Sequence, residues 1–284
     1  MADVQRRRGR GWLPGLALAV VALMLCVICA SAWLRLAQPQ LRCAEWPACR
    51  TGAFGAAAAS SRPATEPGGG PGVQGLVRGV HRAAATVTLV LVAGLVVLAL
   101  RERPRRREVA LPALALLGLA LGLAALGIVT PGSRTAGVLL GNLVGGFAML
   151  AVAGCLALRL RGVPALERSV ARQARVLCGL WLAQAALGAL SGAGLLRLAP
   201  QLHLVLAAVV LPWTLSLALQ VLRAGRRGSG FALAGMCVAQ ALLGFVAAAQ
   251  DAALAAVVLH NAAAALGIAQ LLALAGAVAP GART

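Results

Sequence analysis

This chain contains few charged or otherwise polar residues. Only 12% of its 284 residues are charged, 61% are hydrophobic, and there are three histidines. A soluble protein of this composition would have too little polar surface to cover its apolar side chains. The composition therefore excludes a soluble domain and predicts that most of the chain lies in a membrane.

Acidic residues and aromatic residues are also scarce. The formal net charge is +19, with 26 basic residues against 7 acidic ones, and 3% of the residues are aromatic. A nucleic-acid-binding protein would gather such charge on a soluble domain with aromatic partners, and no such domain is present. No pair of carboxylates falls inside an apolar run, which argues against a transporter of small solutes.

Long apolar runs fill most of the chain. Eight of them approach the ~20 residues that a helix needs to cross a bilayer. We predict an all-α membrane protein with eight transmembrane helices in two pseudo-symmetric four-helix bundles, residues 1–160 and 161–284. The expected spans are roughly 12–36, 77–100, 109–130, 136–158, 173–194, 200–222, 230–249 and 252–278.

The arginines predict the orientation of these spans. If the N-terminus is inside, eighteen of the 26 basic residues fall in cytoplasmic segments. This is the positive-inside pattern, and it predicts that both termini are cytoplasmic. The loop 37–75 then lies outside, and its glycine run 67–72 is a flexible linker, because no Gly-Lys-Ser/Thr follows it to form a phosphate loop. The short remaining connections make every even-numbered span enter the membrane from the outside.

The first 32 residues resemble a signal peptide, with a basic start and the ending Ala30-Ser31-Ala32. Their apolar part is longer than the usual signal core of about 7–15 residues, and cleavage would leave seven spans. We therefore expect a retained first helix. Nothing ahead of it is long enough for a mitochondrial transit peptide, so the expected location is a bacterial plasma (inner) membrane, crossed many times.

A short string recurs at corresponding places. Gln184-Ala-Ala-Leu-Gly188 matches Gln240-Ala-Leu-Leu-Gly244, and Leu123-Ala-Ala-Leu-Gly127 has the same form without the glutamine. Gly127 precedes Asn142 by 15 residues, and Gly244 precedes His260 by 16. This spacing favours two related four-helix halves. The alternative is chance similarity between helices rich in alanine, leucine and glycine.

The three histidines lie near the outer ends of spans that enter from the outside. At a rise of 1.5 Å per residue, His81 and His203 lie roughly 5 Å inside their spans and His260 about 10 Å. His203 and His260 stand on parallel helices, where two opposed imidazoles can bind one haem iron in an apolar bundle. Symmetry pairs His81 with Asn142, a poor iron ligand. The alternative for each histidine is a hydrogen bond to a neighbouring helix, but intramembrane ionisable groups are usually functional.

Cys43 and Cys49 lie in the outer loop, on the oxidising side, where a structural disulfide is expected and redox chemistry is the alternative. Arg35 and Arg82 lie at helix mouths, where they either bind haem propionates or extend to the interface. The other five cysteines fall within spans and are expected to pack as small apolar residues: Cys26, Cys29, Cys155, Cys178 and Cys237.

Several of these residues together resemble the haem A synthase family, which acts in cytochrome c oxidase assembly. Its members carry Arg-Leu-Thr-Gly-Ser-Gly, then Cys-Pro-Asp-Trp-Pro-x-Cys, then His-Arg at the start of the second helix. The matching strings are Arg35-Leu36, Cys43-Ala-Glu-Trp-Pro-Ala-Cys49 and His81-Arg82, and the spacing from Arg35 through Cys43 to Cys49 agrees. Gln240-x-x-Leu-Gly244 and His260 fit as well, so that the resemblance extends over all eight spans.

This resemblance implies a haem b, with its iron, between His203 and His260 in the C-terminal half. It implies a substrate site in the N-terminal half, where the methyl group of haem O is oxidised to the formyl group of haem A. His81 would be the catalytic iron ligand there, with Asn142 opposite. The implied partners are haem O, an electron donor that the sequence does not identify, haem O synthase, oxidase assembly factors and the lipid bilayer, but no nucleic acid.

Three positions depart from the family pattern. Arg78 stands where the family has a glutamate implicated in catalysis, three residues before the histidine of the second helix, and Asn142 replaces the histidine of the fourth. The second half has no outer cysteine pair, and Leu204 stands where an arginine would follow its first histidine. Two functions follow as hypotheses: a monooxygenase of the haem A synthase type, and a non-catalytic haem-binding paralogue for oxidase assembly or electron transfer.

Overall fold

The computed structural model describes residues 2–37, 71–101, 107–129, 135–161, 166–249 and 253–276. All the elements that these residues form are helices. They are α1 (Ala2–Leu36), α2 (Pro71–Arg101), α3 (Arg107–Val129), α4 (Ala136–Leu160), α5 (Arg168–Gly192), α6 (Ala199–Arg223), α7 (Arg227–Ala247) and α8 (Leu254–Gly276).

Each of the eight helices is long and apolar enough to cross a membrane, which confirms the predicted fold class. The chain is therefore a multi-pass membrane protein. The bounds differ most from the predicted spans where a helix extends past its apolar run, and the largest difference is in α1, which begins at Ala2 rather than at 12. α2 begins at Pro71 rather than at 77, and α5 begins at Arg168 rather than at 173. Proline favours the first position of a helix, since its missing N–H would have no partner there.

The early start of α2 corrects the expected depth of His81, which lies ten residues into its helix and not about one turn inside. The 31 residues of α2 span about 46 Å, more than the roughly 30 Å hydrocarbon core of a bilayer. α2 is thus longer than a helix that crosses the bilayer perpendicularly needs to be, by its first few turns.

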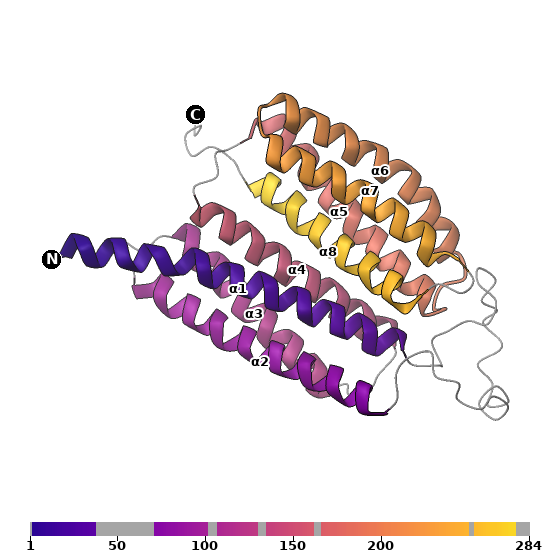
Figure 1. Cartoon of the computed structure of the whole chain (residues 1–284), viewed down its shortest axis with the longest axis horizontal. Helices are drawn as coiled ribbons and strands as arrows, with labels where there is room; N and C mark the ends of the chain where they lie inside the picture. Colours follow the sequence, from indigo (N-terminus) through magenta and orange to yellow (C-terminus); the bar gives the residue numbers. More distant parts are fainter. Residues whose placement is uncertain are drawn as a thin grey trace.

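The helices form two groups of four, α1–α4 and α5–α8, which Figure 1 shows lying side by side. In the first group α1 packs against α2 and α4, and α3 packs against the same two helices. In the second group α5 and α7 each pack against α6 and α8. The pattern of helix–helix contacts is the same in both groups, as two related halves would produce. The pseudo-symmetry itself stays a prediction.

The two groups meet mainly through α4 and α8, the most buried helices. α8 also packs against α1, and α4 against α5. A Cβ placed on Gly154 of α4 would lie 3.7 Å from the Cβ of Ala269 on α8, so small residues let these two helices approach closely. Small residues at such crossings are typical of helix packing in membranes.

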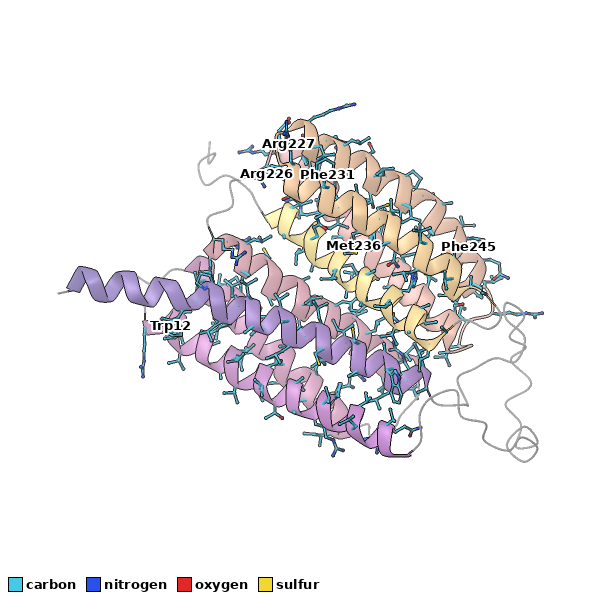
Figure 2. All side chains as sticks on the ribbon, viewed as in Figure 1. Trp12, Arg226, Arg227, Phe231, Met236 and Phe245 are labelled. Carbon is cyan, nitrogen blue, oxygen red and sulfur yellow. The ribbon has the colours of Figure 1, made fainter. Side chains whose placement is uncertain are left out.

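Large apolar side chains point outward from the bundle. Figure 2 shows Phe231 and Phe245 on the outside of α7 and Trp12 pointing away from α1. Phe245 is 82% exposed and Trp12 is 72% exposed, as expected for surfaces that face lipid. Arg226 and Arg227 lie at the turn between α6 and α7, toward the end of the molecule where α1 begins (Figures 1 and 2).

Trp181 fills the interior of the second group. Its indole Nε1 donates a hydrogen bond to Thr214 Oγ1 on α6 at 2.9 Å. Its ring covers Gly267 of α8 so closely that a Cβ at that glycine would lie 2.6 Å from the ring. Trp181 thus joins α5, α6 and α8 at a point one turn along α5 from Gln184.

Candidate functional site

His203 lies four residues into α6, next to the repeated string on α5. The main-chain oxygen of Gln184 lies 2.9 Å from His203 Nδ1, and the Gln184 side-chain Nε2 donates to the His203 main-chain oxygen at 2.8 Å. A Cβ on Gly188 would lie 3.0 Å from His203 Cε1, so glycine at this position makes room for the ring. The string therefore holds the histidine of the following helix.

The hydrogen bond to Gln184 determines which nitrogen of His203 is free. A main-chain carbonyl only accepts, so the proton of the neutral ring must be on Nδ1. Nε2 then keeps its lone pair. A histidine with an Nδ1–H donated to a carbonyl is the usual arrangement of a metal ligand, since the hydrogen bond fixes the ring and makes Nε2 more basic.

His260 lies six residues into α8, next to the matching string on α7. A Cβ on Gly244 would lie 3.0 Å from His260 Cε1, the same separation as at Gly188. The Gln240 side-chain Nε2 lies 3.2 Å from His260 Nε2. The two strings therefore place glutamine and glycine against the two histidines in the same order.

The two imidazoles face each other inside the second group. Their ring centroids lie 6.4 Å apart, and the ring planes are inclined by 70°. Two metal–nitrogen bonds of about 2 Å, with about 1 Å from each nitrogen to its ring centre, would separate two such centroids by about 6 Å. The spacing and the two nitrogen donors therefore fit axial ligation of one haem iron.

Unpartnered polar atoms gather at the same place. Gln184 Oε1, Gln240 Oε1 and His260 Nδ1 are buried without a hydrogen-bond partner, and the only other such side-chain atom in the described residues is Arg226 Nη2. Buried polar atoms are normally paired, so unpaired ones point to a functional site. No group of three or more His, Cys, Asp or Glu side chains forms a metal site elsewhere in the described ranges.

The predicted residues of the first group are less closely assembled. His81 is half-buried on α2 and takes part in none of the hydrogen bonds between described residues. Asn142 is exposed, six residues into α4, which is the register that His260 has in α8. Arg78 and Arg82 are both exposed, four residues apart and hence on one face of α2.

Arg35 lies in the last turn of α1, at the mouth where it was expected. No hydrogen bond or ion pair between described residues joins it to Arg82 or His81. Cys43 and Cys49 lie outside the described residues, so their disulfide stays a prediction. Cys178 and Cys237 are buried without a disulfide, and Cys26, Cys29 and Cys155 are partly buried, as packing residues would be.

The residues that sequence reasoning missed are the partners of the histidines. The repeated string was identified as a sign of internal similarity, but its contact with the rings was not expected. The signal was the nearly constant interval, since Gln184 precedes His203 by 19 residues and Gln240 precedes His260 by 20. An interval of this length brings the end of one membrane helix beside the start of the next.

Sequence comparison gives a separate line of evidence from the first group. Residues 2–137 match a family model, COX15-CtaA, described as a cytochrome oxidase assembly protein. The match runs from α1 into the start of α4, contains His81 and ends before His203 and His260, and it supports the recognised family. No curated protein matches the sequence.

Proposed function

Because the chain belongs to the COX15-CtaA family and thus has a role in cytochrome oxidase assembly, we propose that it oxidises the methyl group of haem O to the formyl group of haem A. The observation that carries this proposal is the pair His203 and His260, with ring centroids 6.4 Å apart. That pair supports a resident haem in the half that the family match does not reach. The two lines of evidence are therefore independent.

In this proposal His203 and His260 hold a low-spin haem b, and Gln184 and Gly188 orient the ring of His203. When bound there, the haem supplies one-electron transfer. The apolar side chains of α5–α8 exclude water from the ring faces, and Trp181 closes the interior beyond the histidines. The chain's own contribution is thus a rigid, dry pair of nitrogen donors.

The substrate haem belongs to the first group, α1–α4. His81 is the proposed catalytic ligand to its iron, and Asn142 on α4 stands in the register of the second ligand. Arg35 and Arg82 are the proposed partners of the haem propionates, since guanidinium groups bind carboxylates with paired hydrogen bonds. A single imidazole opposite an amide leaves one face of the substrate iron less tightly held.

We also propose that the protein lies in a bacterial plasma membrane with both termini in the cytoplasm. The helix starts support this orientation, since α2, α4, α6 and α8 begin at one end of the molecule and α1 begins at the other (Figure 1). The arginines concentrate in the segments on the side of the N-terminus, as the positive-inside rule requires.

A second candidate function is a non-catalytic haem-binding protein for oxidase assembly or electron transfer. It is favoured by Arg78, which stands at the position of the family's glutamate, and by the exposed Asn142. In this alternative the second group binds haem b as proposed, while the first group holds or transfers a haem without oxidising it.

Haem extraction separates the two functions. Membranes of a haem A synthase deletion strain would be compared with and without this chain, and haems B, O and A would be separated chromatographically. The enzyme converts haem O to haem A, whereas the non-catalytic paralogue leaves haem O unchanged while purifying with haem b. A His81→Ala protein serves as the control for activity that comes from the host.

A further inference from the structure

Gln184 and Gln240 occupy equivalent places in the repeated strings, but they hold their histidines differently. Gln184 makes two hydrogen bonds to His203, one through its main-chain oxygen to Nδ1 at 2.9 Å and one through its side chain to the His203 main chain at 2.8 Å. The Gln240 side chain contacts the His260 ring through one pair of atoms, its Nε2 and the ring Nε2, 3.2 Å apart, and the Gln240 main chain lies near the same ring. Among the described residues, His260 Nδ1 is buried without a hydrogen-bond partner.

This difference bears on the nitrogen that an iron would use. Both glutamine contacts of His203 leave its Nε2 free, so they persist when that nitrogen binds iron. Among the described residues, the hydrogen bond to the His260 ring uses Nε2 itself, and one lone pair cannot serve an amide N–H and an iron together. His260 must therefore give up its hydrogen bond to become a ligand, whereas His203 keeps both of its own.

The steric setting of the two rings is nearly the same. A Cβ at Gly188 would lie 3.3 Å from His203 Nδ1, and a Cβ at Gly244 would lie 3.4 Å from His260 Nδ1. The two glycines thus leave matching space for the rings. The inequality lies in the hydrogen bonds, which fix ring orientation and raise the basicity of a ligating histidine.

We propose that the two histidines are unequal iron ligands: His203 is the fixed axial ligand, Gln184 is its positioning residue, and His260 is the exchangeable ligand. This inference rests on the haem b site of the proposed function. It predicts that a small ligand of ferrous haem, such as carbon monoxide, binds on the face of His260.

The first test compares His203→Ala with His260→Ala in the full-length protein purified in detergent. We expect His260→Ala to keep most of its haem as a five-coordinate, high-spin species that binds carbon monoxide at once. His203→Ala should lose most of its haem. In ferrous His260→Ala, the iron–histidine stretching frequency from resonance Raman spectroscopy should be high, as for a ring whose Nδ1–H is donated to a carbonyl.

The second test uses the matched pair Gln184→Ala and Gln240→Ala. We expect Gln184→Ala to lower haem affinity by about ten-fold and to shift the reduction potential, because outer partners of metal-bound histidines typically contribute that much. Gln240→Ala should not lower haem affinity, since its amide contacts Nε2 only in the haem-free protein, and it should leave the reduction potential unchanged. Size-exclusion elution identifies any variant that is misfolded, and imidazole added to His260→Gly should restore the low-spin spectrum.

The possible outcomes distinguish a failure of the unequal-ligand proposal from a failure of the proposed haem b site. A wild-type protein that purifies without haem b overturns both. A wild-type protein with haem b whose two alanine variants lose haem equally, or whose Gln240→Ala variant is affected more than Gln184→Ala, overturns only the inequality. Greater haem retention in His203→Ala than in His260→Ala reverses the assignment and overturns it as well.

Discussion

The two groups of four helices have the same pattern of helix–helix contacts but differ in the polar residues that they carry. In α5–α8, each of two histidines is accompanied by a glutamine and a glycine of the preceding helix. In α3 and α4 the corresponding positions hold Leu123, Gly127 and Asn142. The second histidine and its glutamine are therefore absent together, as would follow if the glutamine serves to hold a histidine.

The glycines show the same contrast. Imidazole rings pack directly against Gly188 and Gly244. A Cβ at the exposed Gly127, in contrast, would meet no described atom within 4 Å. In the first group the tight glycine lies on α4 instead, where a Cβ at Gly145 would lie 2.7 Å from Cδ2 of Leu123. The comparison teaches that the tight glycines of the repeated strings adjoin histidine rings in the second group, and that tight glycines of the first group adjoin leucine side chains.

The largest expected effect is the separate failure of the two groups. We expect His81→Ala to eliminate haem A formation while the haem b spectrum remains largely intact, because the described residues of α2 pack mainly against α1 and α3, within the first group. Haem extraction and the optical spectrum of the same preparation measure the two properties. Normal haem A production by His81→Ala would show that the first group is not the active site.

The next largest effect is the loss of haem affinity when a glycine beside a histidine ring is replaced by alanine. Gly188→Ala should lower haem b affinity by about ten-fold, since the new methyl group would lie 3.0 Å from a ring carbon of His203 and displace it. Gly244→Ala should lower the affinity by a smaller factor, because it displaces the exchangeable His260. Gly127→Ala is the matched control and should leave haem content unchanged. Haem titration of the three purified variants gives the comparison, and equal behaviour of all three would remove the special role of the glycines.

A gain of function tests the relation between the halves directly. Asn142→His together with Leu123→Gln rebuilds in α3 and α4 the pair that α7 and α8 carry. We expect a second low-spin signal in electron paramagnetic resonance after haem is added, with a smaller signal for Asn142→His alone. Asn142→Ala should change little, because an amide is not a strong iron ligand. If the double variant gains no signal, Asn142 does not occupy the position of His260.

The smallest effect concerns stability and not chemistry. Thr214→Val removes the acceptor of the Trp181 indole N–H, which is buried at 2% exposure, while nearly keeping the side-chain volume. An unpaired buried donor should lower the free energy of unfolding by about 1 kcal/mol. Thermal unfolding in detergent measures the change, and haem content at low temperature should stay as in the wild type. A loss of haem without a change in stability would place Thr214 in the site.

The sequence predicted the eight spans because transmembrane helices are determined by apolar length, which is a local property. It predicted that His203 and His260 would share a region, since both start helices that run in the same direction. The start of α2 was missed because the glycines from Gly68 to Gly75 are typical of a linker, although Pro71 suits a helix start.

The contacts of Gln184 and Gln240 were not predictable in the same way. Whether a glutamine faces the next helix depends on how each helix is rotated about its axis, and rotation follows from packing across the whole bundle. Trp181 against Gly267 and Gly154 against Ala269 help to fix those rotations, and each joins residues more than eighty positions apart. Such pairs carry no signal in a single sequence.

The depth of the histidine pair has an electrical consequence. His203 and His260 lie four and six residues from the starts of their helices, so at most about 9 Å of helix separates either ring from the nearer membrane surface. That is about a third of a hydrocarbon core of roughly 30 Å. Moving one charge across the whole membrane takes about 2.3 kcal/mol per 100 mV, so an electron that arrives from the nearer surface crosses only about a third of that field. Its transfer should depend weakly on membrane voltage, whereas an electron from the opposite surface would cross most of the potential.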